Sequence, residues 1–143
     1  MQVSRILQDK GGEVVSVEPE ALVREAARVL AERRIGAVLV KSGESILGIL
    51  SERDIVRGLG TTGAQVLDAP VTRLMTANVV TARPDDRLVD IMRLMTERRF
   101  RHLPVLDEEG RLLGIISIGD VVKYRLAEVE HTAEALSDYI RTG

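Results

Sequence analysis

The chain has 143 residues, of which 45% are hydrophobic, 29% are charged and only 2% are aromatic, and its formal net charge is −2. This composition is that of a globular protein with an aliphatic core, and the length fits one compact domain or two half-size units that share a core. The small net charge and the shortage of aromatic rings argue against nucleic acid as the main partner. No run approaches the ~18 apolar residues of a membrane span, so we expect no membrane partner and a cytoplasmic location.

Cysteine is absent, and the two histidines, His102 and His131, lie far apart in the sequence. The chain therefore has no disulfide framework and no thiolate site. The histidines do not show the spacing of metal ligands, so we expect no metal site.

The sequence contains two copies of one pattern. Six residues recur 65 positions later: Pro19, Arg28, Glu32, Arg33, Arg34 and Val40 return as Pro84, Arg93, Glu97, Arg98, Arg99 and Val105. A Gly-aliphatic-aliphatic-Ser-x-x-Asp motif at 48–54 also returns, at 114–120. Half-size units cannot cover their apolar faces alone, so we expect the copies to pack around a pseudo-twofold axis, with a cleft between them.

The first copy predicts a β-α-β-β-α order of elements. A β-branched stretch at 14–17 ends before Pro19, which suits the entry to a helix. Residues 20–34 have apolar side chains at helical spacing, and Gly36 is expected to end that helix. The remaining elements are a strand at 37–40, a turn at 42–44, a strand at 46–50 and a helix from Ser51 through Leu59.

The second copy repeats this order. Its elements are a strand at 79–81, a helix at 85–98, a strand at 102–106, a turn at 107–110, a strand at 111–116 and a helix from Ser117. The domain boundaries follow: residues 1–62 hold the first copy with its lead-in, 63–78 are a connector, and 79–143 hold the second copy.

The last helix has no counterpart of its length in the first copy. Its apolar residues alternate four and three positions apart, which is heptad spacing: Val122, Leu126, Val129, Ala133, Leu136 and Ile140. The pattern covers fewer than three or four heptads, so two interpretations stay open. The stripe packs on the chain's own body, or it pairs with the helix of a second copy.

A Ser-x-x-Asp sequence marks each junction between a strand and a helix. Ser51 and Ser117 fall at N-cap positions, with Asp54 and Asp120 three residues later. This sequence is close to a capping box, in which serine and acid satisfy backbone N–H groups, and a structural role alone explains it. A carboxylate at such a junction can also accept both hydroxyls of a ribose. Asp54 and Asp120 are therefore the leading candidates for contact with a ligand.

Basic residues follow the first helix of the second copy. Arg101 and His102 lead into the next strand, where alternation would point one of them toward a phosphate in the cleft. Pro104 argues for an edge position, whose neighbours could meet a ligand through the backbone. The first copy has Gly36 and Ala37 at the corresponding place, without a basic side chain. We expect two similar clefts of unequal affinity.

No catalytic motif is present: the sequence has no nucleophile elbow, no Walker loop and no dinucleotide-binding glycine motif. Asp54 and Asp120 could form an acid and base pair, but identical environments would not separate their pKa values. We predict that the chain is not an enzyme.

Taken together, four segments resemble a tandem pair of cystathionine β-synthase (CBS) domains, the Bateman module. They are 74–81 (LMTANVVT), 101–105 (RHLPV), 113–120 (LGIISIGD) and, in the first copy, 47–54 (LGILSERD). The resemblance covers nearly the whole chain from Val14 to Lys123. It implies an α+β fold of two β-α-β-β-α motifs packed sheet to sheet, here extended by a long C-terminal helix.

The resemblance also implies up to two clefts for adenosyl ligands such as AMP, ADP, ATP or NAD(H). The acid of one motif would hold the ribose while the adenine lies against strands of the other motif. One cleft would join Ser51 and Asp54 to Thr76, Thr81, Phe100, Arg101 and His102, beside Pro104. The other would join Ser117 and Asp120 to Val15, Ser16, Ile35, Gly36 and Ala37, with Arg53 a candidate to supply positive charge.

The family usually regulates an attached enzyme or transporter, whereas this chain resembles the stand-alone bacterial versions, which pair as dimers. We expect a homodimeric regulatory module that binds an adenine nucleotide and acts as an energy or redox sensor for a separate, unknown target protein. Two alternatives stay open. One is an interaction protein that docks a partner through its heptad-spaced helix and has vestigial clefts. The other is a small nucleotide hydrolase that uses Asp54 or Asp120.

Overall fold

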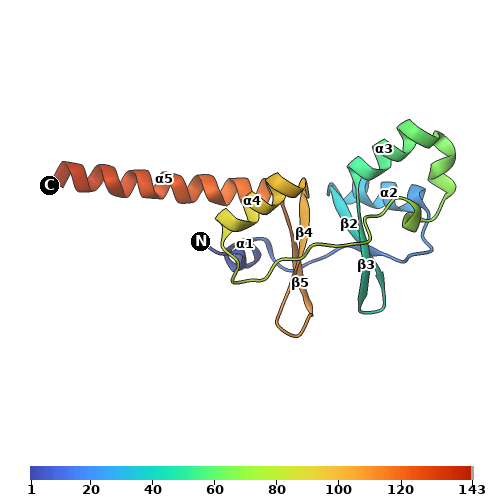
Figure 1. The fold of residues 1–143 in the computed structure, drawn as a ribbon, viewed down its shortest axis with the longest axis horizontal. Helices are drawn as coiled ribbons and strands as arrows, with labels where there is room; N and C mark the ends of the chain where they lie inside the picture. The colour runs from blue at the N-terminus through green and yellow to red at the C-terminus, as the bar shows by residue number, and fades with distance from the viewer. Residues whose placement is uncertain (143) are drawn as a thin grey trace. The chain divides into compact units, whose positions relative to one another are not determined.

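The computed structural model describes residues 1–142 and has the α+β fold expected from the sequence (Figure 1). Its internal contacts divide the chain into two units, each with its own hydrophobic core. The middle unit is Val14–Val79. The terminal unit combines Met1–Glu13 with the chain from Val80 through the last helix. The N-terminal segment therefore completes the unit that is far from it in sequence.

The middle unit has a three-stranded sheet in the order β1-β2-β3, in which β1 is parallel and β3 antiparallel to β2. On helix α2, Val23, Ala26 and Leu30 form one buried face, which packs on the buried side chains of the strands. The elements are β1 (Ser16–Val17), α2 (Val23–Arg33), β2 (Ala37–Ser42), β3 (Ser45–Ser51), α3 (Glu52–Thr62) and the 3₁₀ helices η1 (Ala64–Asp68) and η2 (Val71–Arg73).

Helix α2 ends differently from the sequence-based expectation. Gly36 was expected to end it, but Arg34 takes the left-handed conformation, with φ 54°, and its N–H donates to Leu30 O. The N–H of Ile35 donates to the same carbonyl at 3.1 Å. The expectation was wrong because a non-glycine residue can adopt this conformation when it satisfies free carbonyls at a helix end. Gly36 instead precedes β2, and its carbonyl oxygen accepts the N–H of Glu52 at the start of α3.

The terminal unit contains α1 (Val3–Lys10), α4 (Leu88–Arg98), β4 (His102–Leu106), β5 (Leu112–Ser117) and α5 (Ile118–Thr142). Strands β4 and β5 form an antiparallel two-stranded sheet. The core takes fully buried side chains from every one of these elements, among them Ile6, Leu88, Leu103, Ile116 and Val121. The long C-terminal helix expected from the sequence is confirmed as α5.

Two further expectations in this unit were wrong. Residues 79–81 do not form a strand, because the chain pairs with β4 at a single position, where Ala82 donates to Pro104 O and accepts from Leu106 N, both at 2.9 Å. Helix α4 begins at Leu88 instead of residue 85. The side chain of Asp86 accepts the N–H of Arg83 at 2.8 Å and holds the preceding residues in a turn.

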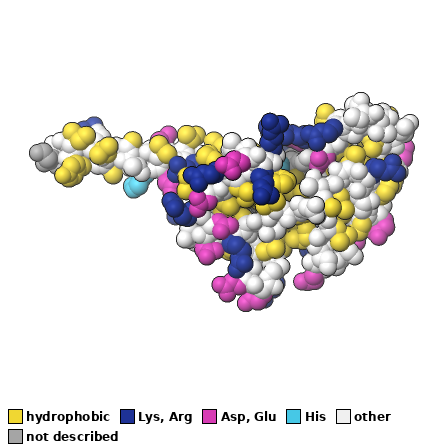
Figure 2. Space-filling view, viewed as in Figure 1, with side chains coloured by type: hydrophobic (Ala, Val, Ile, Leu, Met, Phe, Trp, Pro, Cys, Tyr) yellow, Lys and Arg dark blue, Asp and Glu magenta, His cyan; other side chains and the backbone are white. Residues whose placement is uncertain are grey.

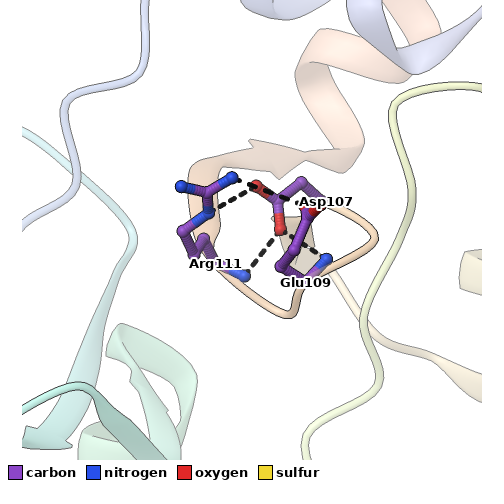
Figure 3. A network of polar contacts seen from close by, with 3 residues as sticks. All are labelled: Asp107, Glu109 and Arg111. Carbon is purple, nitrogen blue, oxygen red and sulfur yellow. Dashed lines mark hydrogen bonds and ion pairs between the residues drawn. The ribbon is translucent and has the colours of Figure 1, made fainter.

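The turn between β4 and β5 is held by one carboxylate (Figure 3). Asp107 Oδ1 accepts the backbone N–H groups of Glu109 at 2.9 Å and Arg111 at 2.8 Å, while Arg111 Nε donates to Oδ2 at 3.0 Å. Gly110 has φ 81°, a conformation that glycine adopts without strain. The backbone N–H of Arg111 is the main reason that the pKa of Asp107 lies below its ordinary value. This network fixes the hairpin register.

The glycine of the repeated motif is covered in the same way in both units. A Cβ atom at Gly48 would lie 2.6 Å from Met75 Sδ, and one at Gly114 would lie 2.7 Å from Leu7 Cδ2. The two covering segments are themselves related, because Val3-Ser4-Arg5-Ile6-Leu7 corresponds to Val71-Thr72-Arg73-Leu74-Met75. Each unit therefore receives its cover from the segment that precedes the other unit in the chain.

Within the described residues, none of the helices combines the length and the apolar character that spanning a lipid bilayer requires.

Candidate functional site

The two Ser-x-x-Asp sequences form helix caps, as the first interpretation of them predicts. In the middle unit, Ser51 Oγ accepts the N–H of Asp54 at 3.2 Å, and Asp54 Oδ2 accepts the N–H of Ser51 at 2.9 Å. Ser51 Oγ also donates to the same carboxylate oxygen at 2.9 Å. In the terminal unit, the corresponding distances for Ser117 and Asp120 are 3.1 Å and 2.9 Å. Both acids are therefore held rigidly at the start of a helix.

The capping role leaves part of each carboxylate for other contacts. All the side-chain hydrogen bonds of Asp54 and Asp120 within the described residues use Oδ2. Each carboxylate has two oxygens and about four acceptor positions, so Oδ1 can receive a further donor. Both side chains are only partly buried. A capped acid of this kind is pre-positioned to accept a hydroxyl group from a ligand.

Lys10 makes the two junctions different. Its Nζ lies 2.7 Å from Asp120 Oδ2 and 3.0 Å from the carbonyl oxygen of Ile115. Partial burial raises the pKa of Asp120, but the hydrogen bonds from Lys10 and the backbone N–H of Ser117 lower it more. The net result is a pKa below the ordinary value. No ion pair of Asp54 is found among the described residues.

Sequence reasoning did not identify Lys10 as a functional residue. The signal that could have found it is the likeness of residues 3–7 to 71–75, which indicates that the N-terminal segment packs on the second copy. Helix α1 continues for three residues beyond this match and ends at Lys10, with Gly11 as its C-cap. That added length carries the ammonium group to Asp120.

In each unit, the start of a strand lies beside the capped helix start of the same unit, whereas the expectation from the sequence pairs each acid with the strand start of the other unit. Gly36 O accepts the N–H of Glu52 at 2.9 Å, and Ala37 is paired with Ser51 across the strands. In the terminal unit, Arg101 O accepts the N–H of Ile118 at 2.8 Å, and His102 is paired with Ser117. Each unit thus gathers a strand start and a capped helix start at one place.

The other expected residues divide between the units. Thr76 exchanges two backbone hydrogen bonds with Ile49, at 3.0 Å and 2.9 Å, and Ser16 pairs with Leu39 on β2. Pro104 is buried within β4, where its carbonyl accepts the N–H of Ala82. The middle unit holds Val15, Ser16, Ile35, Gly36, Ala37, Ser51, Arg53, Asp54 and Thr76, and the terminal unit holds Thr81, Phe100, Arg101, His102, Pro104, Ser117 and Asp120. The pairing of residues across the two units stays a prediction.

These junctions offer hydrogen-bonding groups for a ligand. Ser51 and Ser117 contact the carboxylates of Asp54 and Asp120, and a carboxylate at a helix start is held by its cap. The acceptors and the nearby basic residue Arg101 suit a ligand with hydroxyl and phosphate groups. Among residues 1–142, no three His, Cys, Asp or Glu side chains gather where they could hold a metal ion.

Comparison with known proteins identifies the duplicated fold. The model of the CBS domain family matches residues 3–61 and again residues 71–127. The chain therefore belongs to the CBS domain family and carries two copies of the domain, as the resemblance in the sequence implies. Both matches include the lead-in segments that contain the related residues 3–7 and 71–75.

Similar proteins include whole chains of about this size. The CBS domain-containing protein YhcV of Bacillus subtilis is 32% identical, over 88% of this chain and 88% of its own length. The crystal structure of the CBS-domain containing protein ATU1752 from Agrobacterium tumefaciens is 45% identical, with a TM-score of 0.84, and covers 87% of this chain and 99% of its own. PAE2072 from Pyrobaculum aerophilum, solved in complex with AMP, is 27% identical, with a TM-score of 0.73, over 84% of this chain and 89% of its own.

Proposed function

We propose that this protein is a non-catalytic regulatory module that binds an adenine nucleotide, AMP, ADP, ATP or NAD(H). The observation that carries the proposal is the pair of capped carboxylates, Asp54 and Asp120, each with an oxygen left for a ribose hydroxyl. The AMP complex of PAE2072, a relative with the same fold, supports an adenosyl ligand. The comparisons indicate no enzyme family.

The proposed ligand contacts follow the two sets expected from the sequence. One nucleotide would use Asp54 for the ribose, with Arg101 or His102 near the phosphate. The other would use Asp120 for the ribose and the strand start at Gly36 and Ala37. The structure adds a reason for unequal affinity, since Lys10 already occupies an acceptor position of Asp120 while Asp54 has only its cap.

Calorimetric titration with AMP, ATP and NADH tests this function. Replacement of Asp54 or Asp120 by Asn keeps an oxygen for the helix cap but removes the charge that accepts the ribose hydroxyls. We expect each replacement to weaken binding at its own site by about tenfold to a hundredfold. Arg57→Gln, on the exposed side of α3, is the control. A wild-type chain that binds none of the three nucleotides contradicts the proposal.

The physiological role would be that of an energy or redox sensor for a separate target protein in the cytoplasm. A nucleotide that contacts both CBS domains would favour one arrangement of the two units over the others, which is the differential contact that a switch requires. We propose that the chain acts as a homodimer.

Incubation with ATP tests the alternative that the chain hydrolyses nucleotides. Product formation that Asp54→Asn abolishes would replace the regulatory function with an enzymatic one.

A second candidate function is favoured by the apolar stripe of α5. Leu126, Leu136 and Ile140 expose 58%, 59% and 69% of their surfaces, so the stripe does not pack on the rest of its own unit. Large exposed apolar side chains in a row are typical of interaction surfaces. The chain would then dock another protein through α5, with or without nucleotide.

A further inference from the structure

The outer part of α5 is an addition to the CBS fold. The family match ends at residue 127, whereas α5 continues to Thr142. Figure 2 shows hydrophobic side chains along the part of this helix that extends beyond the body of its own unit. The stripe from Leu126 to Ile140 spans about 21 Å at 1.5 Å per residue. A helix surface of this length and exposure requires an explanation outside the nucleotide site.

The stripe lies on a different side of α5 from the face that packs in its own unit. Val121 is fully buried, and at 100° per residue the centre of the stripe lies about 100° around the helix from it. The side of the stripe is therefore free to receive a second helix while α5 stays docked on α1 and α4. Inside the terminal unit, Tyr124 Oη donates to Asp9 Oδ2 at 2.5 Å, and this hydrogen bond holds α5 against α1.

The stripe contains the receiving surface of a coiled coil. A shallow, open hollow of about 380 Å³ lies on one side of α5 and is lined by Arg125, Glu128, Val129, Thr132, Ala133 and Leu136. Four of these, Val129, Thr132, Ala133 and Leu136, have the spacing i, i+3, i+4 and i+7 that forms a hole for a side chain of a facing helix. The small Ala133 at its centre allows the two helices to approach closely.

The charges beside the stripe select the partner and its direction. If Leu126, Ala133 and Ile140 are a positions and Val129 and Leu136 are d positions, Arg125 is a g position and Glu130 is the next e position. In a parallel pair of identical helices, a g residue faces the e residue five positions further along the partner. Arg125 of each copy then meets Glu130 of the other, which gives two attractive pairs.

An antiparallel pair of the same stripes does not have this match. Its e positions face each other, so Glu130 would lie close to Glu130 of the second copy, and like charges at such positions are destabilising. The Nε atom of Arg125 is buried and its Nη1 donates to Glu128 at 2.5 Å, while Nη2 makes no hydrogen bond among the described residues. The guanidinium group therefore has donors left for a second carboxylate.

We propose that the exposed stripe of α5 binds the same stripe of a second copy of this chain, in parallel and in register. This inference rests on the proposal that the protein is a homodimer and does not depend on nucleotide binding. A parallel pair places both terminal units at the same end of the joined helices. The pairing covers just over two heptads, so it adds to a dimer that other contacts also stabilise.

The chain has no cysteine, so single cysteines give a background-free test of the register. In the parallel pair, Leu136 lies beside Leu136 of the second copy, and Leu136→Cys should be joined efficiently by a short bismaleimide. Glu134→Cys, about 120° around the helix from the stripe, is the matched control and should stay largely uncrosslinked. Crosslinking at 136 no better than at 134, or a chain that is monomeric by sedimentation, overturns the inference. So does a double Leu126→Cys, Leu136→Cys chain that crosslinks when Leu136→Cys alone does not, because it indicates antiparallel helices.

Charge exchange tests the flanking pair. Arg125→Glu and Glu130→Arg should each weaken dimerisation, roughly two- to thirtyfold for two symmetric exposed pairs, and the double exchange should restore it. Rescue in the double variant separates this contact from the bond of Arg125 to Glu128, which the exchange at 130 does not repair. AMP titration on the same variants is a separate measurement. Normal AMP binding without crosslinking overturns the helix pairing alone, and crosslinking without AMP binding overturns the proposed function alone.

Discussion

At the scale of single residues, the ion pair between Lys10 and Asp120 is the feature that most changes the candidate site. Both side chains are partly exposed, at 38% and 25%, so the pair is expected to contribute about 1 kcal/mol or less to folding. Its larger effect is on the acid itself, because it lowers the pKa of Asp120 and fills one acceptor position. Asp54 has the same cap without the ammonium group.

Replacement of Lys10 by Met should raise the pKa of Asp120, since the hydrogen bond and the charge of the ammonium group are among the causes that lower it. A carboxyl with a lowered pKa stabilises the fold above its unfolded pKa of about 3.9, and that contribution is lost as the pH falls through the folded pKa. The measurement is NMR titration of the Asp120 side chain. An unchanged pKa in Lys10→Met, with Lys10→Arg as the charge-preserving control, would show that the ammonium group is not close to the acid in solution.

Replacement of Gly48 tests how closely Met75 and Thr76 pack on it. Replacement by Ala puts a Cβ atom 2.6 Å from Met75 Sδ and 2.8 Å from Thr76 O, so Gly48→Ala should destabilise the protein by about 1–3 kcal/mol. Gly60, inside α3, has nothing within 4 Å of an added Cβ. Gly60→Ala should therefore stabilise the protein by up to about 1 kcal/mol, through helix propensity. Urea unfolding measures both, and equal effects would contradict the packing at Gly48.

At the scale of elements, each covering segment precedes one copy of the repeat in the chain and packs on the other copy. Helix α1 covers Gly114 and supplies the fully buried Val3 and Ile6 to the core of the terminal unit. The segment containing η2 covers Gly48 and supplies the fully buried Val71 to the core of the middle unit. Exchange of these segments ties the two copies together through the chain itself.

Replacement of Ile6 tests how much the packing of α1 contributes to the stability of the terminal unit. It is fully buried, so Ile6→Ala should destabilise the protein by about 2–5 kcal/mol through lost burial and the cavity left behind. Gln8 is exposed on the same helix, and Gln8→Ala should change the free energy of unfolding by no more than about 0.5 kcal/mol. Denaturant unfolding of both variants is the check. A small effect at Ile6 would mean that α1 is detached in solution.

At the scale of the whole molecule, ligand binding should be visible as added stability. A nucleotide that binds only the folded chain stabilises it by about 2.7 kcal/mol at a concentration of 100 Kd, so AMP should raise the Tm. The rise should be smaller in Asp54→Asn and in Asp120→Asn and smallest in the double variant. Adenine-free ribose 5-phosphate is the control ligand. A Tm rise of the same size in the double variant would place the nucleotide away from the capped acids.

Much of this fold follows from the sequence alone. The 65-residue repeat, the Ser-x-x-Asp caps and the heptad spacing of α5 depend on local periodicity and short-range hydrogen bonds, which a sequence expresses directly. The sequence left open whether Asp54 and Asp120 take part in helix caps, and the structure confirms that they do. The roles of these acids and of Arg101 and His102 toward a ligand stay predictions.

The tertiary structure decided what depends on contacts between distant residues. Local pattern does not show that α1 completes the terminal unit or that Lys10 reaches Asp120, 110 residues away, because packing of the core brings them together. The end of α2 at Arg34 and the single pairing at Ala82 are likewise fixed by which backbone groups find partners. The sequence by itself determined a duplicated CBS fold with two similar acids, and only the tertiary structure made the two acids unequal.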